Sequence, residues 1–128
     1  MNRVVHFEMP AEDQERVAKF YGGVFGWQTQ VMGPEMGNYI VATTTESDDN
    51  GPKKPGAING GFFAKSDQQP SIPSVVIEVE NLSDHIKKVK DAGGQVTDEP
   101  QEIPGIGMWV AFIDTEGNRV SMIEPPAR

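Results

Sequence analysis

The stretch VVHFEMPAEDQERVAKFYGGVFGW, residues 4–27, decides the fold of this chain. It begins with valine and phenylalanine side chains that favour strands. Because side chains alternate along a strand, His6 and Glu8 lie on the same face of it. Pro10 lacks a backbone N–H and ends the strand. The first element is therefore predicted to be a short strand that presents an imidazole and a carboxylate on one side.

The same stretch continues as a capped amphipathic helix. Asp13 is suited to the N-cap position, since its carboxylate can accept a hydrogen bond from a free N–H of the first turn. Apolar side chains then recur at i, i+3, i+4, i+7 and i+8, the spacing of one helical stripe; they are Val17, Phe20, Tyr21, Val24 and Phe25. Gly26 allows a left-handed exit from the helix. We predict that the helix covers a sheet and that a new strand begins at Trp27.

Three strands and a loop follow in the first half of the chain. Strand-forming residues between turn signals predict strands at 28–32, 39–45 and 57–63. The segment 46–56 is polar and rich in Gly and Pro, which indicates a mobile surface loop. Gly60 and Gly61 allow close backbone approach or a bulge in the last of these strands. Residues 64–73 are predicted to form a linker.

The second half of the chain repeats this order of elements. The pattern predicts a strand at 74–79, a helix capped by Asn81, strands at 95–97, 108–113 and 119–124, and a Pro/Gly loop at 102–107. The halves also keep register, since the separation of His6 from Ser74 equals that of Gly26 from Gly94. Each half is thus a strand, a helix and three strands, a repeat of pattern rather than of side-chain identity.

The composition restricts the functional classes. A formal net charge of -8 argues against a nucleic-acid-binding protein, because phosphate contacts need clustered lysine and arginine. The chain has no cysteine, which excludes disulfides and thiol chemistry. The sequence has no apolar run of signal-peptide type and no stretch that could span a bilayer, so we expect a soluble cytoplasmic protein.

These motifs together resemble the vicinal-oxygen-chelate superfamily, which contains glyoxalase I, the bleomycin-resistance proteins and the extradiol dioxygenases. The resemblance rests on His6 in the first strand, on Phe20-Tyr21 and on the exit Val24-Phe25-Gly26-Trp27. It extends to residues 91–94 and 112–118, and so spans nearly the whole chain. The superfamily places many chemistries on one scaffold, so these motifs are specific for the fold and weak for the activity.

The resemblance implies an α+β fold of two βαβββ modules, in which a curled, barrel-like mixed sheet surrounds a cavity. A single domain would span residues 1–128, with one module at about 1–65, a linker at about 64–73 and another module at about 74–126. Each sheet would bury its outer face under its helix, and the inner face would line a small-molecule site. Relatives of this length usually pair, so we also expect a homodimer that covers exposed strand edges.

Metal-dependent relatives carry one ligand on the first and last strand of each module, and these positions can be compared residue by residue. His6 stands at the first ligand position. The second histidine position falls on Ser74 and the C-terminal glutamate position on Ser121. The remaining position lies near Asn59, where no carboxylate occurs. Because serine hydroxyls are poor ligands for divalent metals, the resemblance implies a degenerate metal site with His6 as its one strong ligand.

Two interpretations of the remaining polar residues stay open. If His6, Glu8 and Glu78 share the cavity side, an imidazole and two carboxylates would suffice for a divalent ion such as Fe, Ni, Zn or Mn. Alternatively, His6 is a hydrogen-bonded strand histidine, and the two glutamates are solvated or ion-paired. Trp109 follows a flexible Pro/Gly segment, so it is either a shelf for a planar ligand or a plain core contact.

The leading functional hypothesis is a protein that binds a small organic molecule in its cavity without the usual metal. The cavity and ligand-binding candidates are His6, Glu8, Asn59, Ser74, Glu78, Trp109 and Ser121. Within this hypothesis, a bleomycin-resistance-type protein would sequester its ligand, and the acidic surface would suit a cationic one. An enzyme of lyase, isomerase or dioxygenase type would instead need a displaced metal, or His6 as catalytic acid or base. An interaction module without pocket chemistry is a further alternative.

Overall fold

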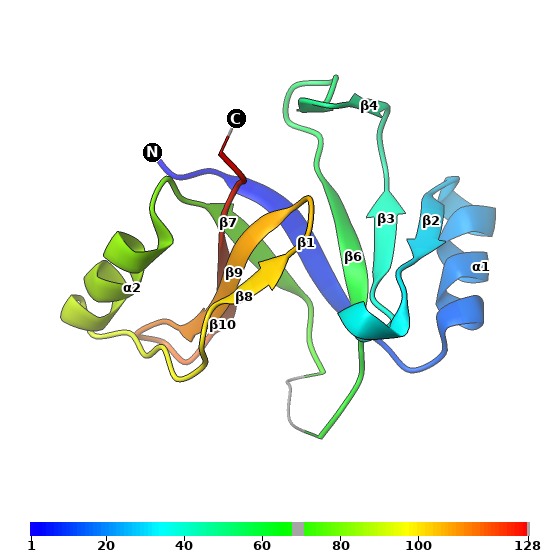
Figure 1. The fold of residues 1–128 in the computed structure, drawn as a ribbon. Helices are drawn as coiled ribbons and strands as arrows, with labels where there is room; N and C mark the ends of the chain where they lie inside the picture. Colours follow the sequence, from blue (N-terminus) through cyan, green and yellow to red (C-terminus); the bar gives the residue numbers. More distant parts are fainter. Residues whose placement is uncertain (68–70, 128) are drawn as a thin grey trace. The chain divides into compact units, whose positions relative to one another are not determined.

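The computed structural model describes residues 1–67 and 71–127, and these residues form two compact units (Figure 1). We call the unit His6–Pro73 module one. Module two consists of Ser74–Arg128 together with the N-terminal segment Met1–Val5. The first strand therefore begins in module two and continues into module one.

Module one has a mixed sheet covered by one helix. Its elements are β1 (Val4–Ala11), α1 (Gln14–Phe25), β2 (Gln28–Val31), the 3-10 helix η1 (Pro34–Met36), β3 (Ile40–Thr43), β4 (Ser47–Asp48), β5 (Gly51–Pro52) and β6 (Asn59–Ala64). The sheet order is β2-β3-β6-β1. Strand β1 runs parallel to β6, whereas β2, β3 and β6 pair in antiparallel fashion.

Helix α1 begins and ends where the sequence predicts. Asp13 adopts an extended backbone, and its Oδ1 accepts a hydrogen bond of 2.9 Å from the backbone N–H of Arg16. Gly26 has φ of 76° and donates its N–H to the carbonyl of Gly22. This left-handed exit satisfies a carbonyl group that the helix would otherwise leave free, and β2 follows directly. The predicted cap and exit are confirmed.

The apolar stripe of α1 packs on the sheet only along its centre. Val17 and Tyr21 pack against the core of module one. Phe20, Val24 and Phe25 are 54%, 60% and 61% exposed. At about 100° per residue, Phe20 lies about 80° and Val24 about 40° to one side of the line midway between Val17 and Tyr21, and Phe25 lies about 60° to the other side. The stripe is therefore wider than the face that the sheet covers, and its flanks remain at the surface.

The core of module one fixes which strand face points away from α1. Ile40, Ala42 and Phe62 are fully buried, and aromatic contacts link this cluster to α1. The ring of Tyr21 stacks on that of Trp27 with centroids 4.5 Å apart. Since strand side chains alternate, the residues between these core positions face away from the helix. His6 and Glu8 of β1 belong to that opposite face, as the sequence predicts.

Module two has the same plan. Its elements are β7 (Ser74–Glu78), α2 (Leu82–Asp91), β8 (Gln101–Ile103), β9 (Gly107–Ile113) and β10 (Arg119–Glu124). The sheet order is β7-β10-β9-β8, with β10 parallel to β7 and antiparallel to β9. Both modules thus contain the βαβββ series, and the predicted α+β class is confirmed.

Helix α2 is held by a predicted cap and by a contact with the last strand. Asn81 Oδ1 accepts a hydrogen bond of 2.9 Å from the backbone N–H of Asp84. The backbone N–H of Leu82 donates to Glu124 Oε1 at 2.8 Å, which satisfies a second free group of the first turn. In the described ranges, 1–67 and 71–127, no helix is long and apolar enough to cross a membrane.

The prediction of a strand at 95–97 is wrong. Gln95 forms a single bridge with Ile113, and the second strand of the module is β8 (Gln101–Ile103) instead. Strand β8 pairs with the start of β9 in a hairpin, in which the backbone N–H of Ile106 donates to the carbonyl of Ile103. The segment 102–107 is therefore not a loop throughout. Its Pro-Gly pair forms the turn of the hairpin, and the flanking residues form the strands.

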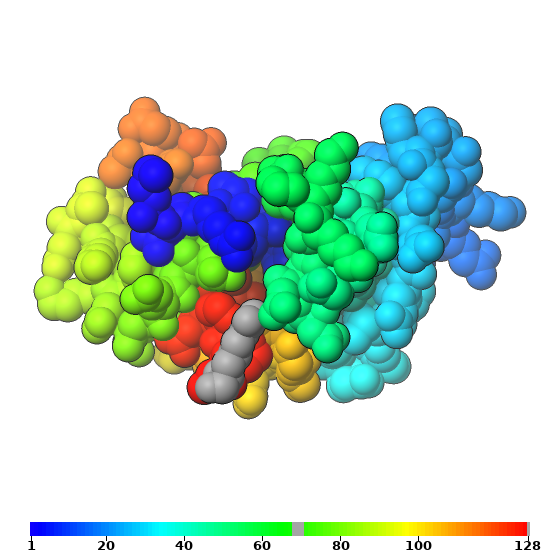
Figure 2. Space-filling model, turned by 90° about the horizontal axis from the view of Figure 1, so that it is seen from above, coloured from blue at the N-terminus to red at the C-terminus, as the bar shows by residue number. Residues whose placement is uncertain are grey.

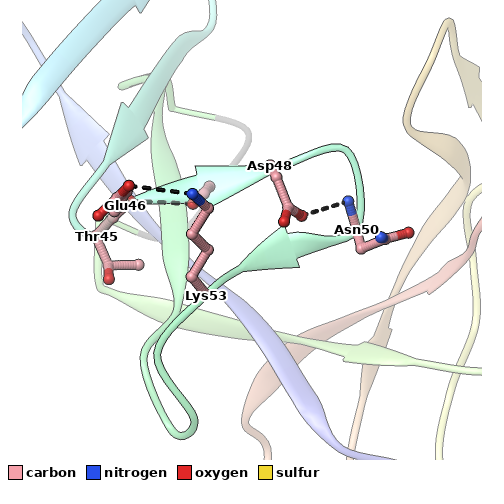
Figure 3. A network of polar contacts seen from close by, with 6 residues as sticks. Thr45, Glu46, Asp48, Asn50 and Lys53 are labelled. Carbon is pink, nitrogen blue, oxygen red and sulfur yellow. Dashed lines mark hydrogen bonds and ion pairs between the residues drawn. The ribbon is translucent and has the colours of Figure 1, made fainter.

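The segment 46–56 is also more ordered than predicted, because it contains the short hairpin β4–β5 (Figure 3). Lys53 forms an ion pair of 3.1 Å with Glu46 across the hairpin. Asn59 anchors the hairpin to the sheet: its Oδ1 accepts a hydrogen bond from the backbone N–H of Thr44, and its Nδ2 donates to Ser47 Oγ, each at 2.8 Å. The candidate ligand-binding residue Asn59 thus has a structural task.

The substitution Asn59→Ala should loosen this hairpin. It removes both hydrogen bonds and leaves the half-buried Thr44 N–H without its partner, so the free energy of unfolding should fall by about 1–3 kcal/mol. Lys53→Ala is the control, because it removes only an exposed ion pair, whose contribution is about 0–1 kcal/mol. Urea denaturation and amide hydrogen exchange across residues 46–56 measure the difference. Equal, small effects of the two substitutions would contradict the anchoring role.

Candidate functional site

The face of module one that points away from α1 brings three of the predicted residues together. In the parallel pairing of β1 with β6, His6 lies opposite Asn59 and Glu8 lies opposite Gly61. All of these pairs belong to the same face, because both strands alternate in step. The side chains of His6 and Glu8 are half-buried. The arrangement places an imidazole and a carboxylate two residues apart beside a glycine that has no side chain.

Tyr39 fills the space above Gly61 and contacts Glu8. A Cβ atom at Gly61 would overlap the hydroxyl end of the Tyr39 ring, so only glycine leaves room for this ring. The Tyr39 hydroxyl donates a hydrogen bond to the Glu8 carboxylate. Burial raises the pKa of Tyr39 far above its usual range, and the negative charge and hydrogen bond of Glu8 raise this pKa further. Tyr39 is therefore a neutral hydrogen-bond donor that orients the carboxylate.

Sequence reasoning did not identify Tyr39 as a site residue. It stands just before β3, where it was expected only as a strand former. The one signal was Gly61, for which the sequence predicted close approach of a neighbouring group. The approaching group is a tyrosine ring rather than a backbone segment. A contact between residues 8, 39 and 61 depends on strand pairing, which local sequence patterns do not determine.

The corresponding face of module two carries the other predicted residues. Ser74, Glu78, Trp109 and Ser121 all lie on the side opposite α2, according to the register of β7, β9 and β10. Trp109 and Glu78 flank Ile123 from its two neighbouring strands. Glu78 forms an ion pair of 3.7 Å with Arg3. Ser74 Oγ donates to the backbone carbonyl of Arg119 at 2.8 Å, so this hydroxyl supports the strand pairing.

Ser121 is the unusual residue of this face. Its side chain is 1% exposed and lies between Val76 and Ala111 on the neighbouring strands. Within the part of the chain that the structure describes, its Oγ has no hydrogen-bond partner. A buried hydroxyl without a partner destabilises the folded state, because it has lost its bonds to water. The sequence placed Ser121 on the correct face but gave no sign of this unsatisfied group.

The residues at the metal-ligand positions of metal-dependent relatives do not fit a metal ion. Ser74, Ser121 and Asn59 supply neutral oxygens, which are weak ligands for the divalent metals that such sites hold. The Ser74 hydroxyl and the Asn59 amide are also already engaged in protein hydrogen bonds. Among the described residues, no group of three or more His, Cys, Asp or Glu side chains is placed to hold a metal.

Each module also has a hollow at its surface. The hollow of module one, of about 390 Å³, lies at the N-terminus of α1 and is lined by the carboxylate-bearing residues Glu12, Asp13 and Glu15 together with apolar residues such as Phe62 and Phe63. The hollow of module two, of about 290 Å³, is lined by the N-terminal residues and by Glu78. Of the predicted site residues, Glu78 lines the second of these two hollows.

Comparison with known proteins gives consistent matches over most of the chain. The family model of the Glyoxalase/Bleomycin resistance protein/Dioxygenase superfamily matches residues 3–122. A glyoxylase-like domain-containing protein of Didymella fabae is 34% identical over 125 residues, which are 94% of this chain and 92% of that protein. The anthracycline biosynthesis protein DnrV of Streptomyces peucetius is 29% identical over 124 residues. This chain spans only 42% of the length of DnrV.

Solved structures agree in fold. Methylmalonyl-CoA epimerase in complex with methylmalonyl-CoA and NH4+ has a TM-score of 0.72 at 15% identity, over 99% of this chain and 96% of that one. The hypothetical protein BH1468 from Bacillus halodurans has a TM-score of 0.70 at 16% identity, over the same shares of the two chains. At these identities the likeness concerns the fold alone.

The substitution Ser121→Ala should raise stability. It removes the unpartnered hydroxyl, and the alanine methyl group occupies the position of the serine Cβ atom. The free energy of unfolding should therefore rise by about 1 kcal/mol. Ser74→Ala is the matched control, since it removes a hydroxyl that has a partner and should lower the free energy of unfolding by about 0.5–1.5 kcal/mol. Denaturation curves of both variants should shift in opposite directions. A loss of stability in Ser121→Ala would show that the hydroxyl has a partner in solution.

The raised pKa of Tyr39 predicts a loss of stability at alkaline pH. Above about pH 10 the tyrosine of the unfolded chain releases its proton, whereas folded Tyr39 keeps it. The unfolded state then binds fewer protons, so the free energy of unfolding falls as pH rises. Tyr39→Phe should reduce this slope, and Glu8→Gln should reduce it only in part, because burial remains. Urea denaturation on both sides of this pH measures the slopes, and identical slopes in the wild type and Tyr39→Phe would contradict the assignment.

Proposed function

The chain belongs to the Glyoxalase/Bleomycin resistance protein/Dioxygenase superfamily, and from this premise we propose that it binds a small organic molecule on the sheet face that carries His6, Glu8 and Tyr39. Binding there would need no metal. The proposed site is the strand face of module one that points away from α1. The polar side chains of that face would hold the ligand by hydrogen bonds.

The observation that carries this proposal is the Tyr39–Glu8 pair above Gly61. A half-buried carboxylate is costly to maintain unless hydrogen bonds compensate it. The Tyr39 hydroxyl satisfies one part of the Glu8 carboxylate and fixes its orientation. A carboxylate held in this way is suited to a ligand that donates hydrogen bonds or carries a positive charge. His6 lies two residues away on the same face and can add a further hydrogen bond.

The chemistry of the ligand is further restricted by charge and by one relative. The formal net charge of -8 favours the approach of cationic molecules, although net charge alone sets no specificity. One matched relative has a role in anthracycline biosynthesis, according to its name. Doxorubicin, an anthracycline, combines a planar ring system with a protonated amino sugar. We therefore place the ligand in the class of aromatic organic amines, and favour sequestration of the bleomycin-resistance type.

Catalysis by proton transfer is the second candidate. A half-buried histidine beside a fixed carboxylate is a suitable acid or base near neutral pH, so His6 supports a metal-independent isomerase or lyase. The sequestration hypothesis requires only binding, and the two hypotheses differ in whether the bound molecule changes.

Titration with doxorubicin, a fluorescent anthracycline, tests the proposed site. Glu8→Gln should weaken binding about 10–100-fold, since it removes a charge-assisted hydrogen bond. Glu15→Gln is the matched control, because it changes an exposed carboxylate of the α1 hollow in the same module. Fluorescence quenching gives the dissociation constants, and chromatography of the recovered ligand shows whether it has reacted.

The outcomes of this titration distinguish sequestration at the proposed face, binding in the α1 hollow, and catalysis. Weaker binding in Glu8→Gln alone, with unchanged ligand recovered, supports sequestration at the proposed face. Weaker binding in Glu15→Gln alone would place the ligand in the α1 hollow and overturn the assignment. A converted ligand, whose conversion stops in His6→Ala, would replace sequestration by catalysis. Equal affinity in all variants would reject both sites for this class of ligand.

A further inference from the structure

An asparagine is followed by a glycine at two places in module one, and the structure treats these two places differently. Of the six asparagines in the chain, only Asn50 and Asn59 have this neighbour. Asn50 is exposed and precedes Gly51 at the turn of the β4–β5 hairpin, and Figure 2 shows the green atoms of this part of the chain at the surface. Asn59 begins β6 and precedes the buried Gly60. The same chemical group thus occurs in two settings.

The Asn-Gly sequence is capable of an intramolecular reaction. The backbone nitrogen of the glycine, once it has lost its proton, can attack the Cγ atom of the asparagine side chain. The new N–C bond closes a succinimide ring, and the side-chain nitrogen leaves as ammonia. Water then opens the ring at either carbonyl, which gives aspartate or a β-linked aspartate whose main chain runs through the side chain. Glycine favours the attack, because no Cβ atom shields its nitrogen and its backbone is the least restricted.

We propose that Asn50 is a site of spontaneous deamidation, with the backbone nitrogen of Gly51 as the nucleophile and solvent water as the second reactant. Strands β4 and β5 have two residues each, and within the ranges 1–67 and 71–127 they pair only with each other. A two-stranded hairpin of this kind is marginally stable by itself. Gly51 also has φ of 107°, in a region that favours glycine. The turn can therefore open and rearrange at little cost.

Contacts that hold the hairpin lie at its base, away from the reacting atoms. The backbone N–H of Lys53 donates to the carbonyl of Glu46 at 2.9 Å, and the two side chains form an ion pair. At the turn, Asp48 Oδ1 accepts a hydrogen bond of 2.8 Å from the backbone N–H of Asn50 (Figure 3). This bond engages the nitrogen of Asn50 and not that of Gly51. The turn can thus open while the base of the hairpin stays in place.

Asn59 is protected by the contacts that make it an anchor. Its side-chain amide accepts one hydrogen bond and donates another, each at 2.8 Å. Gly60 is buried and pairs with Phe7 of β1 on one side and with Ala42 of β3 on the other. Attack by the nitrogen of Gly60 would require this central strand to leave the sheet, which happens only in large-scale unfolding. Asn59 is therefore inert while the protein is folded.

The reaction loosens the hairpin in which it occurs. Both products add a further carboxylate beside Asp48 and Asp49, so like charges gather at the turn. The β-linked product also inserts a methylene group into the main chain before Gly51. This insertion disturbs the pairing of Asp48 with Gly51, because strand register depends on the number of main-chain atoms between the paired residues.

Peptide mapping by mass spectrometry tests the proposal with an internal control. The purified protein is incubated in mildly alkaline buffer, folded or in guanidinium chloride, and replacement of NH2 by OH is followed at both asparagines. In the folded protein Asn50 should react at least about 100-fold faster than Asn59, because a central strand opens far more rarely than a surface hairpin. In denaturant the two should react at similar rates. Asn50→Gln is the matched variant, since it keeps the amide but can close only a larger ring that forms more slowly.

Amide hydrogen exchange tests the structural consequence. Protein that has been aged until Asn50 has reacted should exchange faster across residues 46–56 than fresh protein does. Asn50→Asp supplies the negative charge without lengthening the main chain, so it should show only part of this increase. Aged Asn50→Gln is the control and should exchange like fresh protein.

Two results would overturn the proposal: equal reaction rates of Asn50 and Asn59 in the folded protein, or reaction at Asn50 that occurs only in denaturant. Equal hydrogen exchange in the aged protein and in Asn50→Asp would reject the disturbed register as its consequence. None of these measurements involves the sheet face that carries Glu8, so this proposal and the ligand proposal fail independently.

Discussion

The packing of one face of each sheet under its helix is the constraint on which the rest of this structure depends. In module one, α1 covers the buried residues Ile40, Ala42 and Phe62, and this contact fixes the parity of β1. His6 and Glu8 must then lie on the other face, because a shift of one residue would exchange every side chain between core and open face. The same constraint in module two places Ser74 and Ser121 opposite α2. The polar chemistry of the protein therefore follows from an apolar contact.

Local chemistry determined the parts of the fold that the sequence predicted correctly. The caps at Asp13 and Asn81 satisfy N–H groups only three residues away, so their side chains are sufficient to predict the helix starts. The second strand of module two lies at Gln101–Ile103 and not at the predicted 95–97, because its position depends on pairing with β9, which local sequence does not show. The exposure of Phe20 and Val24 was likewise beyond prediction, since it depends on how much of α1 the sheet covers.

Some residues of the candidate site could likewise be predicted from local sequence, and others depend on strand pairing. Strand alternation was sufficient to place His6 and Glu8 on one face, and the family resemblance was sufficient to identify Ser74 and Ser121 as unsuitable metal ligands. Tyr39 was not predicted as a site residue, because its contacts depend on strand pairing. Tyr39 precedes β3, whereas Glu8 lies in β1 and Gly61 lies in β6. The result is a face whose carboxylate is oriented by a neutral phenol. This arrangement agrees with the proposed binding of a ligand by hydrogen bonds on the superfamily fold.

The proposed function requires that a ligand binds beside the Tyr39–Glu8 pair and that this binding needs no metal. Two-dimensional NMR of the isotope-labelled protein, titrated with doxorubicin in the presence of a chelator, tests both parts at once. We predict that the largest amide shifts occur at His6, Glu8, Tyr39 and Gly61, which surround the pair. Shifts confined to the N-terminus of α1, or shifts that appear only after a divalent metal replaces the chelator, would contradict the claim.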